Sequence, residues 1–178
     1  MADQDPARRA PEAPVSLRTG RDLPHSVDAE QAVLGAILTE ETAFDQVAAE
    51  LRSGDFYLMA HQHVYSVCEE LAKESKAIDP ILVQQRLDAK GLLGGAVPRE
   101  LPLSLARAIG TTANIRHYAR TVRELSQLRK MMLTAQQVVE RGYESGTNVQ
   151  HYLDSSQQEV FSAGQGSSGE TLRKISEP

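Results

Sequence analysis

The feature that most constrains the fold is a stretch of about thirty residues, 112–141, that contains neither proline nor glycine. Nothing in this stretch interrupts an α-helix. Its apolar side chains recur in steps of three and four, which places them on one side of a helix; they are Tyr118, Val122, Leu125, Leu128, Met132, Ala135 and Val139. The pattern predicts one long helix, with Thr112 as its N-cap and Gly142 as the residue that ends it.

A second, shorter helix is predicted after a turn at residues 143–147. Asn148 is a suitable N-cap for it. Its apolar residues lie on one side, with Ser156 interrupting the row; they are Val149, Leu153 and Val160. A long helix, a turn and a shorter helix predict an antiparallel helical hairpin. Because two helices cannot enclose a core, we expect the hairpin to pack its apolar side on the rest of the chain or on another molecule.

The remainder of the chain predicts an all-α fold. Helices are expected at 26–40, 40–51, 60–75, 80–91 and 102–109, with Ser26 and Asp79 as N-caps and Pro80 at the first helical position. Hydrophobic residues make up 40% of the chain and aromatic residues only 4%, so the core is expected to be aliphatic. No run alternates as a strand would. The predicted architecture is a small helical bundle, 24–111, followed by the helical hairpin, 112–163.

Both ends of the chain have the composition of unstructured segments. Residues 1–23 are rich in proline, alanine, arginine and aspartate, which predicts a disordered tail. Residues 164–178 begin with the letters GQGSSG, which predict a flexible linker, and continue into TLRKISEP, the expected start of a further helix.

Localisation is indicated by two simple features. No apolar run approaches the roughly 18–20 residues that span a bilayer. The single cysteine, Cys68, cannot form an internal disulfide and fits a reducing compartment. We therefore expect a cytoplasmic protein that has no membrane segment.

Charge is distributed unevenly along the chain, which has a net charge of −5. Residues 24–111 contain seven basic and thirteen acidic side chains, whereas residues 112–143 contain six basic and two acidic ones. The predicted long helix therefore carries a basic side; it comprises Arg116, Arg120, Arg123 and Lys130. Two interpretations remain open. The favoured one is that these cations pair with the acidic bundle or with Glu124, and the alternative is that they contact DNA phosphates in a stand-alone helical nucleic-acid-binding protein.

The sequence contains no pattern that predicts catalysis or a cofactor site. No glycine is followed directly by lysine, so the Walker phosphate loop is absent, and so is the dinucleotide-binding pattern GxGxxG. His61 and His63 are two residues apart on a predicted helix, so they point in different directions and cannot chelate one metal. Cys68 lies on the apolar side of its helix, which favours a packed thiol over a nucleophile. We expect no catalytic, cofactor or metal site, and no enzyme activity, in this chain.

The hairpin is the predicted functional surface. Met131, Met132 and Leu133 are consecutive, so they spread over more of the helix circumference than one short partner helix covers. This excess of apolar surface predicts self-association or docking of a partner. The predicted interface residues are Leu125, Leu128, Met132, Leu133, Val139, Val149, Leu153 and Val160.

Three stretches of the chain resemble one known family. They read LPHSVDAEQAVLGAIL, then DFYLMAHQHVYSVCEELAKESKAID, then TTANIRHYARTVRELSQLRKM. In this order they resemble the N-terminal domain of the bacterial hexameric replicative DNA helicases of the DnaB type, over roughly residues 22–163. The stretch GAVPRELPLS departs from the family pattern, which leaves the helix at 102–109 in doubt.

The resemblance implies a fold and a role. In this family a small helical bundle followed by a helical hairpin forms a ring-shaped collar, built as three pairs of subunits, on which the primase docks. A helicase loader, if there is one, is a further expected partner. The full-length proteins are ATP-dependent 5'-3' DNA helicases, in which ATP, magnesium and most DNA contacts belong to a RecA-like motor that follows a linker helix. The present chain ends at Pro178 without such a motor, so the resemblance implies an assembly and docking domain.

Overall fold

The computed structural model of the chain describes residues 22–108, 112–144 and 148–165. The predicted tail up to residue 21, and the predicted linker from residue 166 onward, lie outside these ranges. Contacts divide the chain into two compact units. The bundle unit includes His25–Arg123, and the hairpin unit includes Glu124–Pro178 together with Ser16–Pro24.

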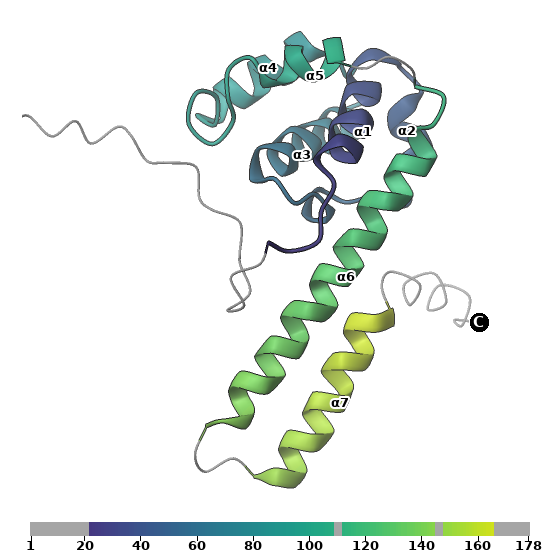
Figure 1. Cartoon of the computed structure of the whole chain (residues 1–178). Coiled ribbons are helices and arrows are strands. Elements are labelled where there is room, and N and C mark those ends of the chain that lie inside the picture. Colours follow the sequence, from purple (N-terminus) through teal and green to yellow (C-terminus); the bar gives the residue numbers. More distant parts are fainter. Residues whose placement is uncertain (1–21, 109–111, 145–147, 166–178) are drawn as a thin grey trace, which may run out of the picture. The chain divides into compact units, whose positions relative to one another are not determined.

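The prediction of an all-α fold is confirmed. The described residues form seven α-helices, one short 3-10 helix and one isolated β-bridge, without a strand. Their bounds are α1 Val27–Thr39, α2 Ala43–Val47, η1 Ser53–Asp55, α3 Met59–Lys73, α4 Pro80–Ala89, α5 Leu101–Ala108, α6 Ile115–Gly142 and α7 Val149–Gln165. The predicted helix at 102–109 is therefore present as α5 (Figure 1).

Three of the predicted N-caps are confirmed by hydrogen bonds. The Ser26 hydroxyl accepts from the amide of Ala29 at 3.2 Å, and Asp79 caps α4 by accepting from two backbone amides at 2.8 and 2.9 Å. Asn148 accepts from the amide of His151 at 3.2 Å and caps α7. Each cap satisfies amide groups that have no partner inside the helix.

Two predictions about helix ends are wrong. The helix expected at 40–51 is only the five residues of α2, because the chain leaves the helix after Val47 and turns toward η1. The long helix α6 begins at Ile115, so Thr112 is not its N-cap. Thr112 instead lies in a turn in which its carbonyl accepts from the amide of Ile115 at 3.1 Å. Asn114, another favourable N-cap type, precedes the first helical residue.

The core of the bundle unit is aliphatic, as predicted, with three aromatic residues at its centre. Helix α1 packs against α3 and α5, and α4 packs against the same two helices. The ring of Tyr65 lies 4.9 Å from that of Phe56 and 5.8 Å from that of Phe44. Cys68 is fully buried beside them, and burial raises the pKa of its thiol, which is the packed and unreactive state expected for it. The first two turns of α6 complete this core through Ile115, Ala119 and Val122.

The hairpin unit has the antiparallel arrangement that was predicted. Figure 1 shows α7 running beside the C-terminal half of α6. Helix α7 extends to Gln165, two residues beyond the predicted end of the hairpin. The two helices of the hairpin unit thus form one layer.

The Asp79 cap provides a test of the assigned helix start. Replacing Asp79 with alanine leaves two α4 amides without their acceptor, so we expect the free energy of unfolding to fall by about 1–2 kcal/mol. Urea denaturation followed by circular dichroism measures this change. Asp88→Ala, an exposed acid near the other end of α4, is the matched control and should change stability by less than about 0.5 kcal/mol. Equal effects of the two substitutions would contradict the assigned cap.

Candidate interaction surfaces

One arginine from the predicted basic side has a structural role in the bundle unit. Arg123 donates to the carboxylate of Asp55 at 3.0 Å, and the backbone amide of Arg52 donates to the same carboxylate at 2.9 Å. The Asp55 side chain is 1% exposed, and that of Arg123 is 14% exposed. A carboxylate removed from water in this way needs a cationic or amide partner. Arg123 therefore ties α6 to η1.

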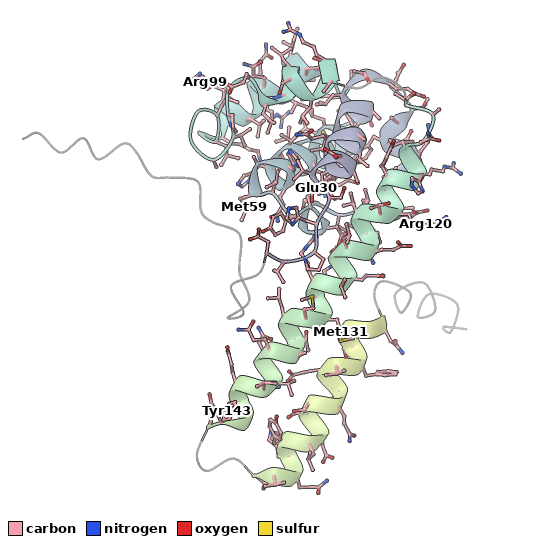
Figure 2. All side chains as sticks on the ribbon, in the orientation of Figure 1. Glu30, Met59, Arg99, Arg120, Met131 and Tyr143 are labelled. Carbon is pink, nitrogen blue, oxygen red and sulfur yellow. The ribbon has the colours of Figure 1, made fainter. Side chains whose placement is uncertain are left out.

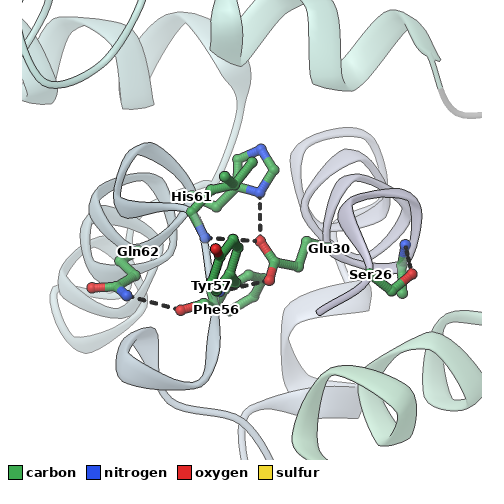
Figure 3. Close-up of polar contacts among 8 residues, drawn as sticks. Ser26, Glu30, Phe56, Tyr57, His61 and Gln62 are labelled. Atoms are coloured by element: carbon green, nitrogen blue, oxygen red, sulfur yellow. Dashed lines mark hydrogen bonds and ion pairs between the residues drawn. The ribbon is translucent and has the colours of Figure 1, made fainter. Parts of the chain in front are cut away.

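The bundle unit also contains a buried hydrogen-bonded pair of side chains that sequence reasoning missed. Glu30 of α1 and His61 of α3 are each 1% exposed, and the His61 Nδ1 atom lies 2.8 Å from a Glu30 oxygen (Figure 3). The other Glu30 oxygen accepts from the amide of Tyr57 at 2.6 Å, and the amide of Leu58 also contacts the carboxylate, at 3.4 Å. Leu58 occupies the N-cap position of α3 and has no side-chain acceptor, so Glu30 supplies the negative charge at this helix start from the neighbouring helix.

A signal for this pair is present in the sequence. Glu30 is three, four and seven residues before apolar core residues of α1, and His61 has the same spacing to core residues of α3. These core residues are Val33, Leu34 and Ile37 in α1 and Val64, Tyr65 and Cys68 in α3. A charged residue placed in an apolar stripe indicates a buried polar contact.

The side of the hairpin on which its two helices meet is largely polar. Arg141 forms two hydrogen bonds with the carboxylate of Glu159, at 2.6 and 2.7 Å. The Tyr152 hydroxyl donates to the Val138 carbonyl at 2.9 Å. Ser156 is buried on the same side of α7, and Figure 2 shows Met131 on the side of α6 that faces α7. The contact between the two helices thus uses few of the predicted interface residues.

The predicted interface residues lie mostly on another side of the hairpin and remain in contact with water. Five of them have exposed fractions between 39% and 69%, and the other three are partly buried. On α6 the residues Leu125, Leu128, Met132, Ala135 and Val139 follow steps of three and four, and on α7 the residues Val149, Leu153 and Val160 follow steps of four and seven. Because the helices are antiparallel, these two stripes flank the contact line on the same side. We call the eight residues the apolar face.

The apolar face differs from the predicted interface in one member. Leu133 follows Met132 directly and therefore points about 100° away from it around the helix axis. It is partly buried and lies outside the stripe, whereas Ala135, which was not among the predicted interface residues, lies within it. Sequence reasoning also omitted two exposed aromatic residues of this unit, Tyr143 at 86% and Phe161 at 65%.

The hairpin also has a groove lined mainly by residues of polar type, which we call the polar groove. It is lined by Lys130, Thr134, Gln137, Ser155, Gln158, Glu159, Ser162 and Ala163. Lys130, one of the predicted DNA-contacting residues, belongs to this groove. The hairpin unit thus has an apolar side and a polar side, which is the asymmetry expected of an amphipathic element that has a partner on one side only.

The remaining residues of the predicted basic side, Arg116 and Arg120, are exposed on α6 within the bundle unit. Neither forms a hydrogen bond or ion pair with any residue that the structure describes. The favoured prediction, that these cations pair with acidic residues, is seen in the structure for Arg123. For Arg116 and Arg120 both interpretations, pairing with acidic residues and contact with DNA, stay predictions.

No metal site or membrane helix is found among the described residues. They contain no group of three or more potential metal ligands, and none of their helices is long and apolar enough to cross a bilayer.

Comparison with known proteins agrees with the fold and with the quoted stretches. Residues 22–124 match the family described as "DnaB-like helicase N terminal domain". The chain belongs to this family. The family match covers the helices of the bundle unit and the first third of α6, and α7 lies beyond it.

Individual relatives extend the similarity over the hairpin. The chain is 37% identical over 153 residues to the replicative DNA helicase DnaB of Mycobacterium leprae (strain TN), covering 83% of this chain and 25% of the relative. It is 31% identical over 149 residues to the replicative DNA helicase DnaC of Bacillus subtilis (strain 168), covering 84% of this chain and 33% of the relative. The chain thus spans between a quarter and a third of these relatives, so it corresponds to one domain of proteins of this kind.

Solved structures show the same DnaB-type fold. The N-terminal domain of the DnaB helicase from Mycobacterium tuberculosis superposes with a TM-score of 0.74 at 34% identity, covering 79% of this chain and 99% of that domain. A DnaB-like replicative helicase, whose structure was determined together with its interactions with primase, superposes with a TM-score of 0.61 at 26% identity. That comparison covers 84% of this chain and 35% of the helicase.

The contact of Arg123 with Asp55 gives a prediction about stability. Arg123→Ala removes the cation from a buried carboxylate, so we expect the free energy of unfolding to fall by about 2–4 kcal/mol. Arg120→Ala removes the same type of side chain from an exposed position one turn away and should cost less than about 0.5 kcal/mol. Urea denaturation of both variants tests the difference. A stability loss from Arg120→Ala that matches or exceeds the loss from Arg123→Ala would contradict these assignments.

Proposed function

We propose that this chain is a non-catalytic assembly and docking domain of a replicative DNA helicase, and that its apolar face is the surface on which subunits pair. The supporting observation is that the apolar side chains of the hairpin unit lie outside the contact between its own two helices. Leu128, Val139 and Leu153 retain 47%, 55% and 46% of their exposure. Burying a side chain of this size stabilises an association by about 1.5–3 kcal/mol.

Pairing of two chains through the apolar face would explain why the apolar residues of the hairpin are exposed while the contacts between its own two helices are largely polar. The inner contacts between α6 and α7 are polar and hold the hairpin together without the apolar residues. These residues are therefore free to contact a second hairpin, and an isologous contact would cover the apolar face of both copies. We expect a dimer at micromolar concentration, and a hexameric ring built as a trimer of dimers in the full-length protein.

The proposed partners follow from the family. The structure of a DnaB-like helicase has been determined together with its interactions with primase, and we propose primase as a partner that docks on or beside the paired hairpins. A helicase loader, if one exists, would be a further partner. We propose that ATP, magnesium and most DNA contacts belong to a motor region outside this chain, and that the protein acts in the cytoplasm.

Charged substitutions on the apolar face test subunit pairing. Leu153→Glu and Val139→Glu should raise the dissociation constant of the dimer at least about tenfold, because each places a carboxylate in an apolar contact. Gln158→Glu, which adds the same charge to the polar groove, is the matched control and should leave the dimer intact. Sedimentation velocity measures association, and circular dichroism verifies that the variants remain helical.

The outcomes of this test are distinct. A monomeric wild-type chain at about 100 µM would exclude pairing, since a dissociation constant above that value corresponds to less than about 5–6 kcal/mol of binding free energy. If Gln158→Glu dissociated the dimer and Leu153→Glu did not, the polar groove rather than the apolar face would be the pairing surface. Addition of purified primase to the wild-type dimer then tests docking.

The absence of a phosphate loop from the sequence gives a second prediction. The purified chain should not hydrolyse ATP above the background of a mock preparation, with or without DNA, because it has no backbone cradle for the phosphates. A coupled phosphate-release assay measures this. ATP turnover that copurifies with the chain through successive columns would contradict the non-catalytic assignment.

A further inference from the structure

Two polar residues of α6 are buried on a side of the helix that does not face α7. Ser126 is 1% exposed and Arg129 is 7% exposed. The Met131 side chain reaches Gly164 of α7, so Met131 marks the side of α6 that α7 covers. Arg129 precedes Met131 by two residues and therefore points about 160° away from it around the helix axis. Ser126 and Arg129 are therefore covered by something other than α7.

Part of this cover is the segment that precedes α1. The Arg129 guanidinium donates to the Pro24 carbonyl at 2.9 Å, across 105 residues of sequence. Leu23, the residue before Pro24, is 3% exposed. Contacts group Ser16–Pro24 with Glu124–Pro178 in the hairpin unit. The segment that leads into α1 thus ends in a direct contact with α6.

The same side of α6 continues beyond Arg129 to an apolar residue. Ser126, Arg129 and Leu133 follow steps of three and four, so they lie in one row along the helix. Leu133 is partly buried and lies outside the apolar face. A buried arginine that holds a backbone carbonyl, followed one turn later by a leucine, is a surface suited to an extended segment of chain.

We propose that Ser126, Arg129 and Leu133 form a docking site, and that its occupant is residues 16–22 of the same chain. Continuity with Pro24, which is already bound to Arg129, supports this occupant. Leu17 is the only large apolar residue in 16–22, and it packs on Leu133. The reach is sufficient, because seven residues span up to about 23 Å, whereas Arg129 and Leu133 are about 6 Å apart along the helix axis.

This docking site is separate from the apolar face. Leu133 points about 100° away from Met132, and its row leads to the segment before α1 rather than to α7. Docking of the N-terminal segment goes beyond the proposed function and does not depend on it, since the segment docks on its own chain whether that chain is paired or not. It limits the disordered tail expected from the sequence to the residues before Ser16.

Cleavage by trypsin after Arg18 tests the docking, because a protease cuts a docked segment only when it opens. In the full wild-type chain this bond should be cleaved at least about tenfold more slowly than in a synthetic peptide of residues 12–25. Cleavage after Arg9, which precedes the segment, should be as fast as in a peptide around that bond. Mass spectrometry of the released fragments measures the initial rates.

Substitutions on both sides of the contact should remove this protection. Leu17→Ser and Leu133→Ser should each bring cleavage after Arg18 to within about twofold of a peptide with the same sequence as the variant. Leu128→Ser makes the same change at an exposed residue of the apolar face and is the matched control, which should keep the protection. Circular dichroism verifies folding, and Leu17→Ser remains a valid test if Leu133→Ser unfolds, because Leu17 lies outside all the helices of the described chain.

Three results would overturn the proposal. The first is a wild-type chain that is cleaved after Arg18 as fast as the peptide, and the second is protection that survives both Leu17→Ser and Leu133→Ser. The third is protection that disappears on dilution of the wild-type chain, which would place the segment on a second copy. Failure of subunit pairing is seen separately, as an unchanged dimer in the Leu153→Glu variant.

Discussion

Two helices that form a single layer can cover only the strip along which they touch, and this limit governs the hairpin unit. Its inner strip holds a bidentate Arg141–Glu159 pair and the Tyr152 hydroxyl on a helix carbonyl. These contacts define how the helices meet but bury little apolar surface. The apolar stripes are consequently left on one flank of the hairpin, in contact with water.

The bundle unit has an enclosed core, and two buried carboxylates connect elements of this unit that lie far apart in the sequence. Glu30 binds two amides and a histidine at the start of α3, and Asp55 binds an amide of its own turn and Arg123 of α6. Each carboxylate accepts from several donors at once, which is how a buried charge becomes tolerable.

The long helix α6 contributes residues to both units. Its first turns close the aliphatic core through residues such as Val122, and its later turns supply half of the apolar face. The helix also contains five arginines with different roles, because position on the helix decides what each can reach. This explains how one basic segment of sequence can contribute to core closure and to the contact with α7, and can leave other arginines exposed.

Much of the fold was determined by the sequence alone. The steps of three and four in 112–141 predicted the long helix, and the caps at Ser26, Asp79 and Asn148 predicted helix starts, because these are local effects of backbone geometry and hydrogen bonding. The resemblance to the DnaB N-terminal domain rested on ordered stretches of residues and needed no coordinates. Local reasoning erred where tertiary contacts decide, as at the early end of the helix expected at 40–51 and at the start of α6.

Only the tertiary structure decided which charges are structural and which are available. Arg116, Arg120 and Arg123 are equivalent as a sequence pattern, yet only Arg123 comes within reach of Asp55, which is 68 residues away in the chain. Likewise, the pairing of Glu30 with His61 and the separation of the hairpin into an apolar and a polar side depend on which helices lie side by side. Periodicity can assign a residue to a side of its own helix, but only packing determines what that side meets.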